Sequence, residues 1–529
     1  MPKEVTLKTE SREALMRGIT LVGEAVGSTI GPRGRNAVIG RTYGPPKITN
    51  DGVTIAKEIE LKDPLENMGA SMMKDVAERT NEEAGDGTST AIVLMQALSK
   101  EGMRYLSRGV NVMSLRAGME RAGDDVIHEL KAMAKPVTDD EIVEVATIAA
   151  ESAELGEVIA DTIKKVGKNG VVTVEESHTL GITAEVVEGM ELKNGYISPA
   201  MVTDIDKMIA EYREVDILVT DKKFSTVSDI VPFLNTLTAG GKKALVIIGD
   251  VDGEALKTVL WNKIRGGFAV LAIKPPGFGD DRREILHDIA VTVGAKVVSD
   301  ETGVTLDASA LGSAHRVVSK EKVTTIVGGA GKHEEIDARV AHLRNQVEEI
   351  DTKFSKDKML ERIGKLSGGV AIIRVGASTE GDMTYLKDKI EDAVNATRAA
   401  IEEGVVAGGG SALVRVAKKL EKGNTDIGYG IVMKALYAPL EQILLNAGKR
   451  RRCWFQWRGE IESIVAWVKG GTQAGYNPVN DKFVVDMLEA GIIDPVKVTR
   501  TAVKRAVSAA AILITTEVAI VDSVNNLVK

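Results

Sequence analysis

The sequence Gly85-Asp86-Gly87-Thr88-Ser89-Thr90 directly precedes the apolar run Ala91-Ile92-Val93-Leu94-Met95. Glycine lets the backbone approach a ligand closely and adopt positive φ, and the unpaired N–H groups of a helix N-terminus attract phosphate. A carboxylate in the same turn, here Asp86, suits Mg²⁺, which prefers carboxylate and phosphate oxygens. The stretch therefore predicts a phosphate and magnesium site at the start of a buried helix. Simple turn chemistry and ordinary helix capping remain open as alternatives.

The composition is typical of a globular protein. The 529 residues are 44% hydrophobic and 27% charged, and a chain of this length is expected to form two to four domains. The net charge of −8 argues against nucleic acid or an anionic membrane as a partner. The single cysteine, Cys453, excludes an internal disulfide and suits a reducing compartment. With no targeting segment and no apolar run of membrane-spanning length, we expect a cytoplasmic protein, or one whose targeting segment is missing from this sequence.

The apolar pattern changes along the chain. A helical period predicts helices over residues 9–28, 155–166, 228–238, 253–265, 283–293 and 382–403. Short apolar runs predict strands over residues 37–39, 171–174, 244–248, 269–273, 296–298 and 370–375. The alternation of strand and helix from 244 to 298 predicts an α/β unit with a buried parallel sheet. Both ends of the chain are helical and alanine-rich, which indicates that the first and last thirds fold together.

Six motifs resemble those of the group I chaperonins, the 60-kDa or GroEL type. They are Gly31-Pro32-Arg33-Gly34-Arg35-Asn36, Gly85–Thr90, Pro276-Gly277-Phe278-Gly279-Asp280, Ala396-Thr397-Arg398-Ala399-Ala400, Glu402–Gly410 and Ile493-Asp494-Pro495. The resemblance runs in the same order from about residue 5 to residue 522. It implies a multidomain α and α/β subunit that belongs to a 14-mer of two stacked heptameric rings, capped by a 10-kDa-type co-chaperonin.

The same resemblance implies three domains. A mostly helical equatorial domain that binds ATP and makes the ring contacts is expected over residues 1–132 and 403–529. A small α/β intermediate domain is expected over residues 133–187 and 370–402, and an α/β apical domain over residues 188–369. The hinge candidates are Pro136, Gly189, Gly368, Gly369 and Gly404, because glycine absorbs large changes of φ and ψ.

An ATP site must be built without a P-loop, since the sequence has no G-x-x-x-x-G-K-[ST] run. The resemblance implies that Asp86 binds Mg²⁺ and that Gly87, Thr88, Ser89 and Thr90 hold the β- and γ-phosphates. It places Thr29, Ile30, Gly31 and Pro32 along the α-phosphate, with K⁺ beside Thr29. Adenine and ribose are expected against Gly409, Asn477, Val479 and Asp494. Without the resemblance, Asp494 before Pro495 would be interpreted as a simple turn or N-cap residue.

Two further carboxylates complete the expected catalytic set. Asp392 matches the residue that orients or activates the attacking water, and the resemblance implies that it reaches the nucleotide only when the intermediate domain moves. Asp51 matches a second carboxylate near the γ-phosphate. A solvated carboxylate on a helix face is the alternative interpretation of Asp392.

Two helices of the middle region carry more apolar residues than one buried stripe requires. The resemblance implies that Val231, Leu234, Leu256, Leu260 and Trp261 face the ring cavity and bind non-native polypeptides. It assigns the same role to Tyr196, Ser198 and Met201, and it implies that the mobile loop of the co-chaperonin docks on this surface. Core packing is the alternative interpretation of each of these residues.

Three features depart from the family. Asn50 stands where many bacterial relatives have lysine, and the usual Gly-Gly-Met-rich tail is missing after Asn525. Residues 449–458, Lys-Arg-Arg-Arg-Cys-Trp-Phe-Gln-Trp-Arg, interrupt the resemblance until Gly475. Nucleic-acid contact by this basic and aromatic stretch conflicts with the acidic charge of the chain, so an insertion or a local reading-frame error is the favoured interpretation. An ATP-using enzyme of small molecules and a chaperonin-like scaffold without folding activity remain as alternative functions.

Overall fold

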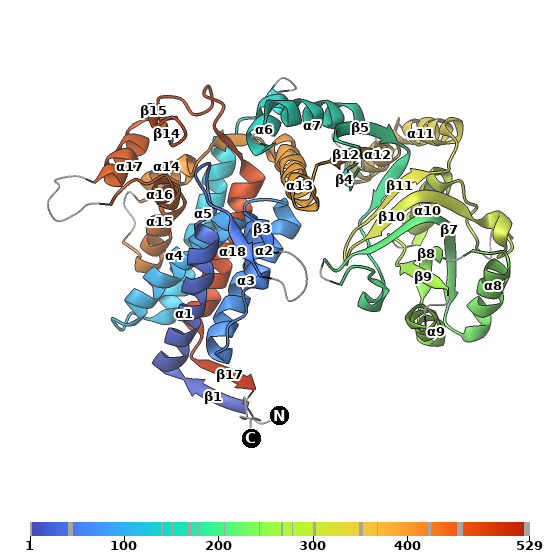
Figure 1. Ribbon diagram of the computed structural model, residues 1–529, viewed down its shortest axis with the longest axis horizontal. Helices are drawn as coiled ribbons and strands as arrows, with labels where there is room; N and C mark the ends of the chain where they lie inside the picture. The colour runs from blue at the N-terminus through green and yellow to red at the C-terminus, as the bar shows by residue number, and fades with distance from the viewer. Residues whose placement is uncertain are drawn as a thin grey trace. The chain divides into compact units, whose positions relative to one another are not determined.

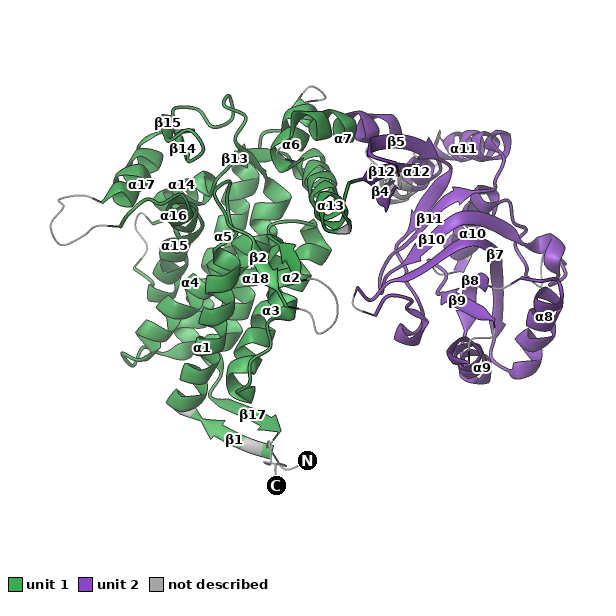
Figure 2. Ribbon diagram, viewed as in Figure 1, with its two compact units in different colours: residues 1–160, 377–529 green, residues 161–376 purple. Residues whose placement is uncertain are grey.

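The structure is a computed structural model of the 529-residue chain (Figure 1). It describes residues 3–40, 46–138, 141–150, 152–167, 171–177, 179–205, 207–242, 244–265, 268–277, 279–299, 303–348, 353–367, 369–421, 425–451 and 459–522. The chain forms two compact units (Figure 2). Unit 1 comprises Met1–Ala160 and Ala377–Lys529, and unit 2 comprises Asp161–Gly376. The residues expected to form an intermediate domain are divided between the two units, so the three-domain boundaries stay a prediction.

Unit 1 is mainly helical. Its helices are α1 (Lys8–Gly27), α2 (Gly52–Glu58), α3 (Pro64–Ala84), α4 (Thr88–Leu106), α5 (Val112–Met133), α6 (Glu141–Ala150), the first half of α7 (Ala153–Val166), α13 (Glu380–Glu403), α14 (Ser411–Leu420), α15 (Ile427–Ala435), α16 (Ala438–Asn446), α17 (Glu460–Gly470) and α18 (Val496–Thr515). The strands that the structure describes in this unit form four antiparallel pairs. These pairs are β1 (Lys3–Leu7) with β17 (Val518–Asp522), β2 (Ala37–Ile39) with β3 (Lys47–Thr49), β13 (Val405–Ala407) with β16 (Ile493–Pro495), and β14 (Gly475–Asn477) with β15 (Lys482–Val484).

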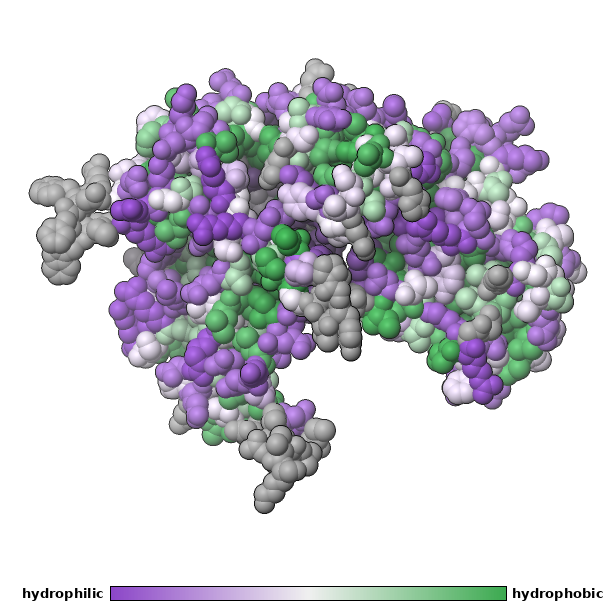
Figure 3. All heavy atoms as spheres, viewed as in Figure 1, coloured by the Kyte–Doolittle hydropathy of each residue, from purple (hydrophilic) through white to green (hydrophobic). Residues whose placement is uncertain are grey.

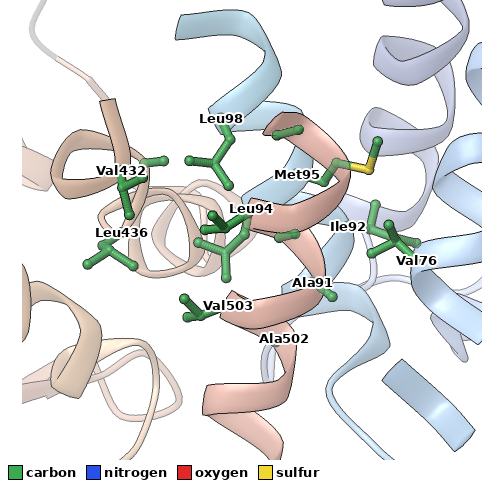
Figure 4. Packing of buried hydrophobic residues seen from close by; sticks show 14 of the residues in the cluster. Val76, Ala91, Ile92, Leu94, Met95, Leu98, Val432, Leu436, Ala502 and Val503 are labelled. Atoms are coloured by element: carbon green, nitrogen blue, oxygen red, sulfur yellow. The ribbon is translucent and has the colours of Figure 1, made fainter. Parts of the chain in front are cut away.

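The core of unit 1 surrounds α4. Figure 4 shows α4 side chains packed among those of α3, α15 and α18; the labelled residues are Val76, Ala91, Ile92, Leu94, Met95, Leu98, Val432, Leu436, Ala502 and Val503. The run from Ala91 to Met95 is buried at every position, because a helix that is apolar on all sides must be covered on all sides. This burial fixes the N-terminus of α4, and with it the preceding turn at residues 85–87.

The two ends of the chain meet within unit 1. Strand β1 pairs with β17 over its whole length, with Lys3 opposite Asp522 and Leu7 opposite Val518. Lys3 Nζ lies 2.5 Å from Asp522 Oδ1 at the open end of this ribbon. Helix α1, which follows β1, and helix α18, which precedes β17, are therefore joined to the same two-stranded ribbon. This agrees with the prediction that the first and last thirds of the chain fold together.

Unit 2 is built on a six-stranded mixed sheet of order β6-β11-β10-β7-β8-β9. Its strands are β6 (Gly189–Leu192), β7 (Ala210–Phe224), β8 (Ala244–Val251), β9 (Ala269–Ile273), β10 (Gly312–Ser319) and β11 (Thr324–Gly329). A three-stranded sheet of order β4-β12-β5 contains β4 (Val171–Glu176), β5 (Gly181–Val187) and β12 (Val370–Gly376). The helices are α8 (Val227–Ala239), α9 (Gly253–Ile264), α10 (Gly279–Val293), α11 (His333–Glu348) and α12 (Lys353–Ser367), with 3₁₀ turns at Pro199–Met201 and Ala308–Ala310.

The prediction of a parallel sheet holds for the strands from which it was made, because β8 and β9 pair in parallel, but the sheet to which they belong is mixed. Among the described strands of the large sheet, only β7, β8 and β9 are parallel neighbours, and β6, β11 and β10 pair antiparallel. The expected strand 296–298 is reduced to one parallel bridge between Thr220 and Val298. Strand β10 pairs antiparallel with the edge of β7 that faces away from β8. No further parallel strand can therefore be added to β7 on that side. Among the described residues, no helix is both long and apolar enough to cross a membrane.

Candidate functional site

A cavity of about 150 Å³ lies within unit 1. Its walls are the segment before α2, the turn before α4, part of α6 and one face of α13. The lining residues are Ile48, Thr49, Asn50, Asp51, Asp86, Ala149, Thr384, Tyr385, Asp388, Lys389 and Asp392. The structure thus brings together Asp51, Asp86 and Asp392, which lie far apart in the sequence. Asp392 already lines the cavity in this arrangement of unit 1.

Asp51 is fixed by its place before α2. Its carboxylate accepts hydrogen bonds from the backbone N–H groups of Val53 and Thr54, at 3.1 and 3.0 Å, and from the Thr54 hydroxyl at 2.6 Å. These are the bonds of an N-cap residue. The Asp51 N–H in turn donates to Thr49 Oγ1 at 3.1 Å. Capping therefore holds one carboxylate rigidly at the edge of the cavity.

The turn between α3 and α4 holds Asp86. Gly85 ends α3 at φ 72° and Gly87 precedes α4 at φ 80°, both in the left-handed region that glycine adopts without strain. A Cβ atom on Gly85 would stand 2.5 Å from Asn395 Cβ of α13, and one on Gly87 would stand 2.5 Å from Val498 Cγ1 of α18. The Gly87 N–H donates to Asp86 Oδ1. Both glycines are needed because the turn is enclosed by two other helices.

Burial and like charge act together on the carboxylates of the cavity. Burial raises the pKa of Asp86, and the nearby Asp51 charge raises this pKa further. Burial also raises the pKa of Asp392 well above its usual range, with Asp86 and then Asp51 as the next causes. A cation at this place would relieve that repulsion and keep both groups ionised. In the described part of the chain, no three His, Cys, Asp or Glu side chains are grouped as ligands for a metal ion.

The loop after α1 approaches the same helix N-terminus. Thr29 Oγ1 donates to Val26 O at 2.8 Å and lies 3.5 Å from Ser89 Oγ in the first turn of α4. Gly31 takes φ 84° against Ile443 of α16, where a Cβ atom would meet that side chain at 3.0 Å. Of the expected residues Thr29, Ile30, Gly31 and Pro32, Thr29 thus stands beside the Thr88–Thr90 segment, although neither segment lines the 150 Å³ cavity.

Asn446, the last residue of α16, holds the loop after α1 in place, a role that the sequence analysis did not predict. Its Nδ2 donates to Gly27 O and to Ile30 O, both at 2.9 Å. These two bonds fix the turn that leads into Gly31. The sequence signal is weak because an asparagine before Ala447-Gly448 is typical of any helix C-terminus.

Asp494 and Gly409 meet where β13 pairs with β16. Asp494 stands opposite Val406 in this pair, and its buried carboxylate accepts hydrogen bonds from the backbone N–H groups of Gly409 and Gly410. Burial, with the Asp86 charge as the second cause, raises the pKa of Asp494 to about 6. Gly409 has φ 61° and Gly410 has φ 75°, so the chain turns sharply into α14.

Asn477 and Val479 form a second turn near the loop after α1. The Asn477 side-chain oxygen accepts from the Val479 N–H at 2.9 Å, and Arg33 Nη2 donates to Val479 O at 3.0 Å. The Val479 side chain is 56% exposed. Arg33 thus connects this turn with the residues that follow Pro32.

Residues 22–523 of the chain match the TCP-1/cpn60 chaperonin family. The chain belongs to this family. Two crystal structures of the chaperonin gp146 from the bacteriophage EL 2 (Pseudomonas aeruginosa), both solved in the presence of ATP-BeFx, have a similar fold. They are 20% and 21% identical to this chaperonin with TM-scores of 0.70 and 0.64, and each comparison covers 98% of this chain and 99% of the phage chain. The prediction of a chaperonin subunit with α and α/β parts is confirmed.

The expected polypeptide-binding surface of this chaperonin is smaller than its apolar pattern indicates. Met201 is fully buried and Leu234 is 4% exposed, both in the core of unit 2, so neither side chain lies on open surface in this arrangement and their binding role stays a prediction. The reason is helical spacing: Ile230, Phe233, Leu234 and Leu237 form one stripe of α8 that packs on the sheet. Tyr196 is also buried, and Ser198 caps the 3₁₀ turn at Pro199–Met201.

Open apolar surface remains on α9 and at the edge of α8. Trp261 is 56% exposed and Ile264 is 69% exposed. Val231, Leu256 and Leu260 are partly buried against the core. In Figure 3 green patches lie among purple ones over the lower part of unit 2, where Figure 1 places α8 and α9. Ile264, which was not among the expected residues, is exposed to a larger fraction than any of them.

The hinge candidates of the chaperonin occupy tight backbone positions. Gly404 ends α13 at φ 81°, where an added Cβ atom would stand 2.6 Å from Lys135 O, and Gly369 precedes β12 at φ 61°. A Cβ atom on Gly189 would stand 2.3 Å from Ile326 O. Gly368 lies outside the described residues, as does the divergent stretch 452–458. A hinge role stays a prediction for all five positions.

Proposed function

We propose that this chaperonin binds and hydrolyses ATP in unit 1. The main support for the proposal is that Asp51, Asp86 and Asp392 line one cavity. This cavity lies beside the N-terminus of the 19-residue helix α4. A helix N-terminus attracts phosphate, and buried carboxylates in excess attract a metal cation. The phage chaperonin of similar fold, which was crystallised with ATP-BeFx, supports a nucleotide as the ligand.

The residues of the site take separate roles in this proposal. Gly87 and the hydroxyl residues Thr88, Ser89 and Thr90 hold the β- and γ-phosphates through the first turn of α4, and the Thr29–Pro32 loop follows the α-phosphate. Asp494, Gly409, Asn477 and Val479 hold the base and ribose. Asp392 accepts a proton from the attacking water and Asp51 orients that water or the γ-phosphate.

Two cations fit the donors of this site. Asp86 is the carboxylate expected to hold Mg²⁺, because it is buried beside Asp51 and belongs to the phosphate-binding turn. Thr29, whose hydroxyl points toward Ser89, is expected beside K⁺. Mg²⁺, when bound, neutralises the charge that the phosphate oxygens carry.

We also propose that non-native polypeptides bind to the exposed side of α8 and α9. Val231, Leu256, Leu260, Trp261 and Ile264 supply the apolar contacts, which demand no particular sequence of the bound chain. In the full proposal the subunits form a 14-mer of two heptameric rings in the cytoplasm, and a 10-kDa-type co-chaperonin closes the ring over the released polypeptide. The five hinge candidates allow the apical and equatorial parts to move.

A refolding experiment tests the proposal. A chemically denatured enzyme is diluted into buffer with this chaperonin, Mg·ATP, K⁺ and a 10-kDa-type co-chaperonin, and its recovered activity is measured. We expect recovery only when all components are present, and no recovery with the Asp392→Ala variant. ATP hydrolysis and ring assembly without any recovery would favour the alternative of a diverged scaffold with ATPase activity but no folding activity.

A further inference from the structure

The charges of the cavity in unit 1 are unevenly distributed. Four carboxylates line it, namely Asp51, Asp86, Asp388 and Asp392, whereas Lys389 is the one basic residue among the described residues of the lining. A bound triphosphate would bring further negative charge into this space. Since Asn50, a lining residue from the segment before α2, carries no charge, the protein itself can supply a cation to the phosphates here through Lys389.

Lys389 is placed toward the reacting end of a bound nucleotide. It lies one helical turn before Asp392 on α13, so both side chains belong to the same face of that helix and line the same cavity. The residues expected at the α-phosphate and at the base, such as Thr29 and Asn477, do not line it, and neither does the Thr88–Thr90 segment. The lining residues with an expected role are Asp86, for Mg²⁺, and Asp51 and Asp392, for the γ-phosphate and the attacking water. A cation at this position is therefore near the γ-phosphate, where Asp392 is proposed to act.

Tyr385 holds the lysine side chain. The Lys389 ammonium lies 5.7 Å from the centre of the Tyr385 ring, which stands one turn earlier on α13 and also lines the cavity. A cation over an aromatic ring is attracted to the ring face without losing its ability to donate hydrogen bonds to an anion. The ring thus limits the rotamers of a long side chain before a nucleotide arrives.

We propose that Lys389 binds the γ-phosphate of ATP and makes the site prefer ATP over ADP, with Tyr385 as its positioning residue. This inference rests on the proposed ATP site. The lysine offsets the negative charge that the γ-phosphate adds between the four carboxylates. It also draws α13, and with it Asp392, toward a nucleotide that has a third phosphate, and it gives no such contact to ADP.

The test compares the affinities of two nucleotides. Calorimetric titration with Mg²⁺ and either a non-hydrolysable ATP analogue or ADP is made on the assembled wild-type protein and on the Lys389→Gln variant. We expect Lys389→Gln to weaken binding of the ATP analogue by about 10-fold to 100-fold, the usual value of a hydrogen bond to a charged group, and to change ADP binding by less than about twofold. Lys387→Gln, on the same helix but outside the cavity lining, is the matched control and should change neither affinity.

Three further variants separate a phosphate contact from a structural role. Lys389→Arg should keep most of the preference for the ATP analogue. In the Lys389→Gln background, Asn50→Lys should restore part of that preference, because Asn50 lines the same cavity. Tyr385→Phe should bind as the wild type does, whereas Tyr385→Leu should weaken binding of the ATP analogue several-fold.

The outcomes distinguish the two levels of the proposal. If the wild-type protein binds ATP analogue and Lys389→Gln binds it equally well, or if both nucleotides lose affinity equally, the role of Lys389 is overturned and the ATP site stands. If the wild-type protein binds neither nucleotide, the proposed ATP site is overturned, and the role of Lys389 with it.

Discussion

Gly52, the first residue of α2, lies directly against Ser89 in the first turn of α4. A Cβ atom on Gly52 would stand 2.5 Å from Ser89 Oγ and 2.9 Å from Thr88 Oγ1. Real Cβ atoms do not come this close to another heavy atom, so the position admits only glycine without displacement of the phosphate-binding turn. Because Gly52 has no Cβ atom, the N-terminus of α2, which Asp51 caps, can lie against the hydroxyl residues at the N-terminus of α4.

We therefore expect Gly52→Ala to lower the affinity for Mg·ATP by about tenfold, because a shift of about 1 Å at a binding site has effects of this order or larger. The melting temperature should change little, since alanine favours a helix more than glycine does. Gly430→Ala in α15 is the control, because no atom lies within 4 Å of the added methyl group. Unchanged nucleotide affinity in Gly52→Ala would show that the two helix ends need not meet for binding.

Asp392→Ala should bind Mg·ATP and hydrolyse it about 100-fold to 10,000-fold more slowly, the range that loss of a general base produces. Single-turnover hydrolysis and equilibrium binding measured on one preparation separate these two effects. Glu391→Ala, next to it on α13 but outside the cavity lining, should turn over normally. Normal turnover by Asp392→Ala would remove this carboxylate from the mechanism.

Asp86→Ala should weaken nucleotide binding itself, and the loss should be larger with Mg²⁺ present than with the metal chelated. The reason is that Asp86 is the buried carboxylate proposed to hold the cation, and metal affinity depends directly on its ligands. Titration of ATP at fixed protein concentration, with and without Mg²⁺, measures the difference. Equal affinities for wild type and variant under both conditions would contradict the assignment.

Trp261→Glu should reduce capture of a denatured protein by about tenfold while ATP hydrolysis and the melting temperature stay near the wild-type values. Trp261 is 56% exposed, so a charge there is solvated, and single aromatic residues commonly dominate apolar binding surfaces. Leu234→Glu is the contrasting variant: Leu234 is 4% exposed, and a buried unpaired carboxylate should destabilise unit 2 outright. Capture is measured by co-sedimentation, and full capture by Trp261→Glu would contradict the surface assignment.

Asp494→Asn should remove one pH-dependent component of stability. Burial raises the pKa of Asp494 from 3.8 to about 6 in the folded protein, so the fold favours the protonated form. Between pH 3.8 and about pH 6 the unfolded chain releases the Asp494 proton while the folded protein keeps it. Asp494 therefore lowers the free energy of unfolding as the pH rises through this range, and above about pH 6 its effect becomes constant. The free energy of unfolding of both proteins is measured in urea between about pH 4.5 and pH 7. The stability of the variant should increase relative to that of the wild type as the pH rises. A constant difference would refute the shifted pKa.

Much of the local structure followed from short-range patterns. The strand at residues 37–39, the helices ending near Gly27, Val166 and Ile264, and the acidic turn before α4 agree with the expectation, because spacing, capping and glycine positions act within one or two helical turns. The strand expected at 296–298 is a single parallel bridge, and Leu234, which was expected to face the ring cavity, is buried. The pairing of residues 296–298 and the burial of Leu234 both depend on which neighbouring segment covers them. The sequence cannot distinguish an apolar residue of a core from one of a binding surface.

The sequence alone determined the membership of the chain in a chaperonin family, the left-handed glycines around Asp86 and the identity of the acidic residues, because these depend on residue type and order. Only the tertiary structure placed Asp51, Asp86 and Asp392 around one cavity with Lys389 beside them, supported the loop after α1 through Asn446, and buried Leu234. Packing of helices distant in sequence decides these distances, and the energies of charge and burial depend on distance and not on order along the chain.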